Sequence, residues 1–125
     1  MSALLDAVLD TLLPGVDGLP AGSRIGLDAA PHAQALRLIA GDNEASFIAA
    51  SADVRAGVLR RVEAQPAVQA LIAAALTRYY QSDVVVTAMG WRTTPPQPTG
   101  HKVAATDAAT WERLEKVKAR GRIWR

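Results

Sequence analysis

Two histidines, His32 and His101, are the side chains of this 125-residue sequence best suited to metal binding or proton transfer. Neither shares an expected helix with a second histidine or a carboxylate at ligand spacing. The serines stand at expected helix caps or in loops, and none lies in a Gly-x-Ser-x-Gly motif. The chain contains no cysteine, which removes thiolate ligands, disulfides and a cysteine nucleophile. We therefore expect this chain to have no catalytic residues, no metal site and no bound cofactor.

A glycine-rich segment, PGVDGLPAGSRIGL at residues 14–27, could in principle cradle a phosphate group. Phosphate-binding loops follow a strand and continue into Gly-Lys-Ser/Thr, whereas this segment has no strand before it and no such tripeptide after it. We interpret it as a loop between helices.

The remaining pattern is helical, with apolar residues recurring at three- and four-residue spacing. The first expected helix precedes Pro14-Gly15, which ends it. Further helices are expected over 29–40 and 44–50. Ser51 is expected to cap a helix with Val54, Val58, Leu59 and Val62 turned inward. The fold class that follows is all-α, a small bundle of about four to five helices followed by an extended arm and a C-terminal helix.

The stretch RYYQSDVVVTAMGWR, residues 78–92, ends the strongest helical pattern, which begins at Pro66. Tyr79 and Tyr80 continue its apolar stripe, so we predict both as structural core residues. Ser82 is expected to cap a short helix over 83–89, and Gly90 to end it. A buried strand at 84–87 is the alternative, because β-branched runs favour strands.

After Trp91 the sequence TTPPQPTGHK has three prolines and almost nothing apolar, which predicts an extended arm. The fourteen residues of 92–105 could reach about 45 Å at roughly 3.3 Å per residue. Thr106 is expected to cap a last helix with a narrow apolar stripe. We therefore divide the chain into a helical body, residues 1–91, and an arm with a docking helix, residues 92–125, which is not an independent domain.

Tryptophan and arginine are enriched at interface hot spots, and the segment tethered by the arm holds two of the three tryptophans, Trp111 and Trp124. We therefore predict a partner interface in and next to this segment. Its expected residues are Trp91, Arg92, Trp111, Leu114, Arg122, Ile123, Trp124 and Arg125.

The charge of the chain is divided unevenly. Up to Trp91 there are six arginines and nine acidic residues, whereas from Arg92 onward there are eight basic and three acidic residues. A basic tail can be a solvated end, can meet an anionic partner surface or can bind nucleic acid. The run RLEKVKARGRIWR, with an aromatic residue able to stack on a base, keeps a nucleic-acid-binding module as the alternative function.

The order of three motifs, VLDTLLPG, SADVRAGVLRRVEA and RYYQSDVVVTAMGWR followed by a proline-bearing arm, resembles the gluconate 2-dehydrogenase subunit 3 family. The resemblance covers most of the chain and implies a small, helical, non-catalytic subunit. Its partner would be a large flavoprotein of the glucose-methanol-choline oxidoreductase family, which oxidises sugars, sugar acids or alcohols with FAD. The substrate and flavin sites would then lie in the partner.

The matching residues, namely Tyr79, Tyr80, Ser82, Gly90 and Trp91, would mark the turn from which the arm leaves the body. The sequence lacks the twin-arginine signal that many relatives carry before the first helix. We therefore expect a cytoplasmic protein, periplasmic only if exported with a partner, and no apolar run is long enough to predict a membrane span. A free-standing small enzyme is a third interpretation, which the lack of a catalytic constellation disfavours.

Overall fold

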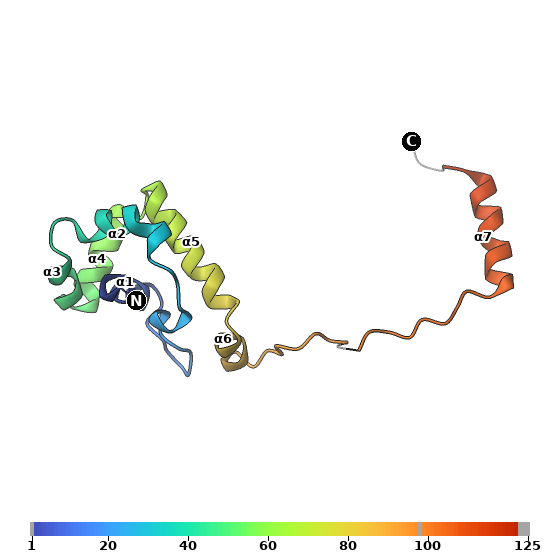
Figure 1. Cartoon of the computed structure of the whole chain (residues 1–125), viewed down its shortest axis with the longest axis horizontal. Coiled ribbons are helices and arrows are strands. Elements are labelled where there is room, and N and C mark those ends of the chain that lie inside the picture. The colour runs from blue at the N-terminus through green and yellow to red at the C-terminus, as the bar shows by residue number, and fades with distance from the viewer. Residues whose placement is uncertain (1, 98, 123–125) are drawn as a thin grey trace. The chain divides into compact units, whose positions relative to one another are not determined.

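The computed structural model describes residues 2–97 and 99–122, and within them every regular element is helical (Figure 1). The expected all-α fold class is confirmed. The chain divides into two units, Met1–Thr93, here called the body, and Thr94–Arg125, here called the tail. The elements of the body are α1 (Ala3–Leu12), η1 (Gly22–Ile25), η2 (Ala30–His32), α2 (Ala33–Ala40), α3 (Glu44–Ala49), α4 (Ala52–Val62), α5 (Pro66–Tyr80) and α6 (Asp83–Ala88). The tail contains α7 (Ala108–Arg120).

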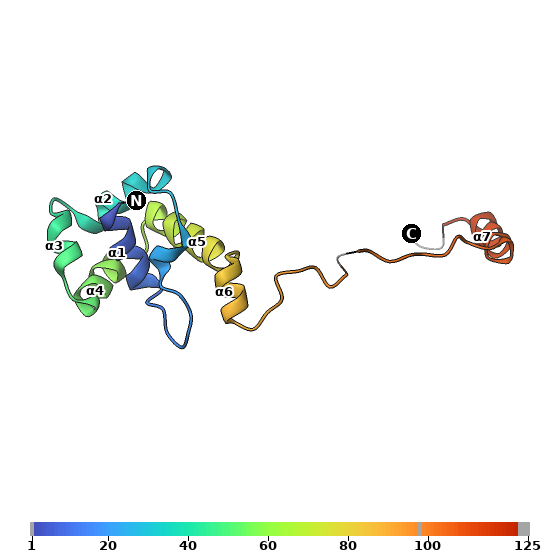
Figure 2. The ribbon, with the colours of Figure 1, turned by 60° about the horizontal axis from the view of Figure 1, so that its bottom comes forward.

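Helix α1 lies inside the body, between α3 and α4 on one side and the short 3-10 helix η1 on the other (Figures 1 and 2). Its buried side chains form the middle of the core, because they cover more than half of the helix circumference and water reaches almost none of them. These residues are Leu4, Leu5, Ala7, Val8 and Leu9. Helices α2 and α5 pack against each other and close the core with Leu36, Ile39, Val68, Leu71 and Ala75.

The predicted cap of α4 is confirmed, since the Ser51 hydroxyl oxygen accepts a hydrogen bond from the Val54 N–H at 3.4 Å. The predicted inward stripe of α4 is only partly right. Leu59 is buried and Val58 is half-buried, but Val54 is exposed. Val54 lines an open groove beside Phe47 of α3 instead of the core.

Tyr79 and Tyr80 end α5, and they have opposite environments. Tyr79 is 3% exposed and belongs to the core, as predicted, whereas Tyr80 is 54% exposed, so its prediction as a core residue was wrong. Consecutive residues of a helix lie about 100° apart. Leu71, Ala75 and Tyr79 follow one row that faces the core, while Tyr80 belongs to a second row with Leu76, which is also exposed.

The segment between α1 and α2 is held down at several points and is not a plain loop. It contains η1, whose Gly22 lies so close to α1 that a Cβ atom there would collide with the Leu9 carbonyl oxygen. Two side chains from the end of α5 bind its main chain: the Tyr79 hydroxyl donates to the Pro20 carbonyl at 2.7 Å, and the Arg78 Nε–H donates to the Ile25 carbonyl at 3.2 Å. The expected loop over 14–27 is therefore an anchored segment with a helical turn inside it.

Residues 83–88 form helix α6 and not the alternative strand, which would have had no strand to pair with in the described residues. Ser82 stands at the N-cap position with an extended backbone, but its hydroxyl makes no capping hydrogen bond, so its predicted capping role is not realised. Gly90 ends the helix as predicted. The Gly90 N–H donates to the Thr87 carbonyl at 2.9 Å and the Trp91 N–H to the Val86 carbonyl at 3.0 Å, a Schellman motif with Gly90 at φ +75°.

Helix α7 begins one residue later than expected. Its cap is Asp107 and not Thr106, because the Asp107 carboxylate accepts a hydrogen bond from the Thr110 N–H at 2.7 Å. Hydrogen bonds from the Thr110 side chain and backbone lower the pKa of Asp107. None of the described residues between the end of α6 and the start of α7 lies in a helix. In the part of the chain that the structure describes, no helix combines the length and apolar character needed to cross a bilayer.

Candidate partner interface

Trp91 is the first predicted interface residue, and it stands immediately after the Schellman motif that ends α6. Its side chain is 65% exposed, although tryptophan is the largest apolar side chain available to a core. The motif satisfies the last carbonyl groups of α6 and fixes the backbone at Trp91 by a hydrogen bond, so the indole is presented from an ordered turn. Arg92 follows it and is also exposed.

Helix α7 carries the next two predicted residues, Trp111 and Leu114, on one stripe with Val117, here called the tail stripe. The three residues follow three-residue spacing, which places them on adjoining turns of one face. Trp111 is 52% exposed, the other two are also exposed, and no residue of α7 is buried. The helix therefore has an amphipathic pattern whose apolar side is not covered by the other described residues of the tail.

Lys118 adjoins the tail stripe and contacts Trp111. Its ammonium nitrogen is 5.9 Å from the centroid of the Trp111 ring, within the range of a cation–π interaction. The same nitrogen lies 3.1 Å from a carboxylate oxygen of Glu115, one turn earlier. Because both contacts are exposed, they add little stability.

Two arginines border the tail stripe. Arg113 and Arg120 lie four residues before and three residues after Val117, so both are its neighbours on the helix surface. In the described part of the chain the only ion pair is the one between Lys118 and Glu115, so neither arginine is neutralised there. Sequence reasoning did not select these two residues, although the spacing from Val117 was a signal that could have identified them.

Of the other predicted interface residues, Arg122 is exposed just beyond α7. Ile123, Trp124 and Arg125 lie outside the described residues. The interface prediction therefore rests on Trp91 and Arg92 in the body and on three residues of the tail.

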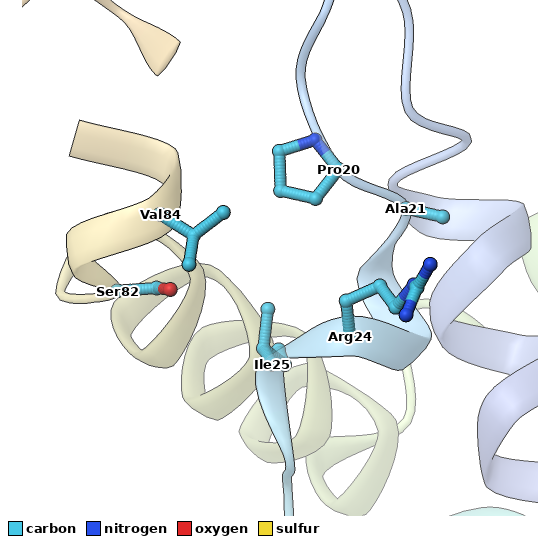
Figure 3. Close-up of a pocket in the computed structure, with 6 residues that line it drawn as sticks. All are labelled: Pro20, Ala21, Arg24, Ile25, Ser82 and Val84. Carbon is cyan, nitrogen blue, oxygen red and sulfur yellow. The ribbon is translucent and has the colours of Figure 1, made fainter. Parts of the chain in front are cut away.

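A cavity of about 590 Å³ opens on the body between η1 and the start of α6 (Figure 3). We call it the α6 pocket, and its lining is Pro20, Ala21, Arg24, Ile25, Ser82 and Val84. The lining is mainly apolar, and the Ser82 hydroxyl, which caps no helix, points toward its interior (Figure 3). Tyr79 supports one wall through its bond to Pro20. Such a lining suits an apolar side chain and offers no pair of titratable groups for acid–base chemistry.

The two histidines lie in unrelated settings. His32 ends η2, and His101 shares a hydrogen bond of 2.8 Å with the Gln97 side-chain amide in an exposed stretch. Among residues 2–97 and 99–122, no group of three or more histidine, aspartate or glutamate side chains is placed to hold a metal ion. The buried hydroxyl of Tyr79 is the group whose pKa is displaced upward, by burial and then by the neighbouring Tyr80.

No family model, curated protein or solved structure matches this chain. The body ends in the exposed Trp91, and α7 of the tail has an exposed apolar stripe bordered by Arg113 and Arg120.

Proposed function

We propose that this chain is a non-catalytic small subunit that binds and stabilises a large FAD-dependent oxidoreductase acting on sugars, sugar acids or alcohols. The observation that carries the binding role is the exposure of Trp91 and of the tail stripe, in a tail where the described residues are all exposed. Large apolar side chains grouped on one helix face mark sites of interaction when the chain itself does not cover them.

The choice of a flavoprotein as partner is supported by the resemblance of the motif order to the gluconate 2-dehydrogenase subunit 3 family. The matching stretch, residues 78–92, includes α6, its Schellman motif and the exposed Trp91. In this proposal the body packs against one face of the large subunit, and the arm and α7 extend along its surface. The FAD and the substrate are held by the large subunit.

Copurification tests the proposal. The chain, tagged and coexpressed with the large reading frames that neighbour its gene, should bring down a yellow protein in fixed stoichiometry whose flavin absorbance is released on denaturation. A Gly-x-Gly-x-x-Gly motif near the start of that protein would identify its dinucleotide-binding domain. If every neighbouring flavoprotein is expressed in soluble form and none copurifies, the proposal fails.

A truncated chain supplies the control. Removal of residues 94–125 deletes the whole tail and leaves the body, whose core residues all precede it. We expect the truncated chain to unfold cooperatively at nearly the temperature of the full chain and to lose the partner. Loss of cooperative unfolding would show instead that the tail is part of the core.

A nucleic-acid-binding module remains the second candidate, because α7 and the two residues after its end expose Arg113, Lys116, Arg120 and Arg122 together with Trp111. Such a tail should bind a single-stranded oligonucleotide with an affinity that falls steeply as salt is added. A gel shift that shows no complex even at low ionic strength would remove this candidate.

A further inference from the structure

The tail stripe and its border have a pattern of charge that restricts what can cover them. Seven residues separate Trp111 from Lys118, so both lie on the same face, and the two are in contact. Arg113 and Arg120 adjoin Val117 at the other end of the stripe. A surface that covers the stripe therefore also covers or closely approaches three cations.

The acidic residues of α7 do not neutralise this border. Glu115 is committed to Lys118 at 3.1 Å, and among the described residues of the tail no carboxylate lies within ion-pair distance of Arg113 or Arg120. Covering an unpaired arginine with neutral or basic protein surface would remove its water without replacing the lost interaction, which is costly. A partner that supplies carboxylates avoids this cost, and the planar guanidinium can bind each of them through two hydrogen bonds.

We propose that α7 docks on an acidic surface of the large flavoprotein subunit, with Trp111 in an apolar depression and Arg113 and Arg120 against carboxylates of the partner. This inference rests on the proposed function and adds the chemistry of the receiving surface. Attraction between opposite charges raises the rate at which the helix meets that surface.

Lys116 provides a matched control within the same helix. Leu114 is the middle residue of the tail stripe. Lys116 lies about 200° around the helix from it, and thus on the opposite face. Arg113→Glu and Lys116→Glu make the same change of charge three residues apart in one helix. Only Arg113→Glu places a carboxylate beside the tail stripe.

The test measures the affinity of the full-length chain for the copurified flavoprotein by surface plasmon resonance over a series of salt concentrations. We expect the affinity to fall by about tenfold or more between low and high salt, mainly through slower association. Arg113→Glu should weaken binding by at least about tenfold at low salt. Lys116→Glu, whose new carboxylate adjoins Arg113 and Arg120 but not the tail stripe, should weaken it by a clearly smaller factor. Circular dichroism of both variants checks that α7 remains helical.

The outcomes separate this inference from the proposed function. A stable complex whose affinity ignores salt, or that Lys116→Glu weakens as much as Arg113→Glu, overturns the acidic surface and leaves the small-subunit role intact. If the chain alone dimerises and Arg113→Glu abolishes the dimer, the acidic surface belongs to a second copy and the inference is overturned. No complex with the flavoprotein at any salt concentration overturns both, and salt-sensitive binding of a single-stranded oligonucleotide would then assign the tail to nucleic acid.

Discussion

Replacing Tyr79 should destabilise the body far more than replacing its neighbour Tyr80. Tyr79 is 3% exposed and its hydroxyl donates to the Pro20 carbonyl at 2.7 Å. Removing a large buried aromatic side chain costs about 3 to 5 kcal/mol, so Tyr79→Ala should lower the free energy of unfolding by that amount. Tyr79→Phe keeps the ring and deletes the hydrogen bond, which costs about 1 kcal/mol.

Replacing Tyr80 by alanine should cost less free energy of unfolding, because Tyr80 is already 54% exposed. Its main contribution is an edge-to-face contact with Tyr79, with ring centroids 5.5 Å apart and planes at 89°. Such pairs are worth about 0.5 to 1.5 kcal/mol, so Tyr80→Ala should cost about 1 kcal/mol. For a domain of this size, each kcal/mol corresponds to a shift of roughly 4 to 8 °C in Tm.

Urea unfolding of the full chain, followed by circular dichroism, measures all three variants against the original. Two variants of Tyr79 are needed, because the free energy of unfolding of Tyr79→Phe can be measured even if Tyr79→Ala does not fold. The reasoning is refuted if Tyr80→Ala costs as much as Tyr79→Ala, or if Tyr79→Phe leaves the free energy of unfolding unchanged.

Four further predictions follow from the same structure. Burial raises the pKa of Tyr79 above its unfolded value near 10.0. The stabilising contribution of the neutral hydroxyl is therefore complete below pH 10.0 and is lost as the pH rises through the folded pKa. The urea midpoint should accordingly fall less at alkaline pH in Tyr79→Phe than in the original chain. Gly22→Ala should destabilise the body, because the added Cβ would force η1 away from α1. Gly57→Ala, in open space on α4, should stabilise the body by up to about 1 kcal/mol. Thermal melts of the two variants measure both effects. Asp107→Ala should reduce the helicity of the tail, and because the pKa of Asp107 is lowered, the original cap should hold above pH 4 and weaken as the pH falls through the folded pKa, which NMR of the capped amide would report. Trp111→Ala should leave the Tm of the isolated chain nearly unchanged and weaken the complex by about 2 kcal/mol or more; a lower Tm with unchanged affinity would contradict the docking role.

The elements that the sequence predicted correctly are those whose cause is local. Ser51 caps α4 and Gly90 ends α6 because capping depends on a few neighbouring residues and on backbone angles that particular residue types favour. Asp107 and Thr106 are both good caps, and the pattern alone could not choose between them. Errors of one residue at a helix boundary are of this kind.

The environments of α5 side chains could not be predicted in the same way. Apolar residues cover so much of this helix that its periodicity permits several buried faces. The contacts of α5 with α2 and η1 decide that Tyr79 is buried while Leu76 and Tyr80 are exposed. The α6 pocket was missed for a related reason, since it joins residues 20–25 to residues 82–84, and no short pattern reports a contact of that separation.

The anchoring of η1 by the end of α5 also sets the order in which the chain can fold. Tyr79 and Pro20 are 59 residues apart, and Arg78 and Ile25 are 53 apart, so both bonds close large loops in a chain whose other contacts are mostly within or between neighbouring helices. During synthesis η1 can already pack on α1, since the Gly22 N–H donates to the Leu13 carbonyl at 2.8 Å and the Ser23 N–H to the Asp10 carboxylate at 2.8 Å, but the two bonds from α5 form only after its last turn has left the ribosome. Nascent chains that stop short of Tyr79 should therefore be more sensitive to proteases and more readily bound by chaperones than chains only a few residues longer, a step in behaviour placed well before the tail is made.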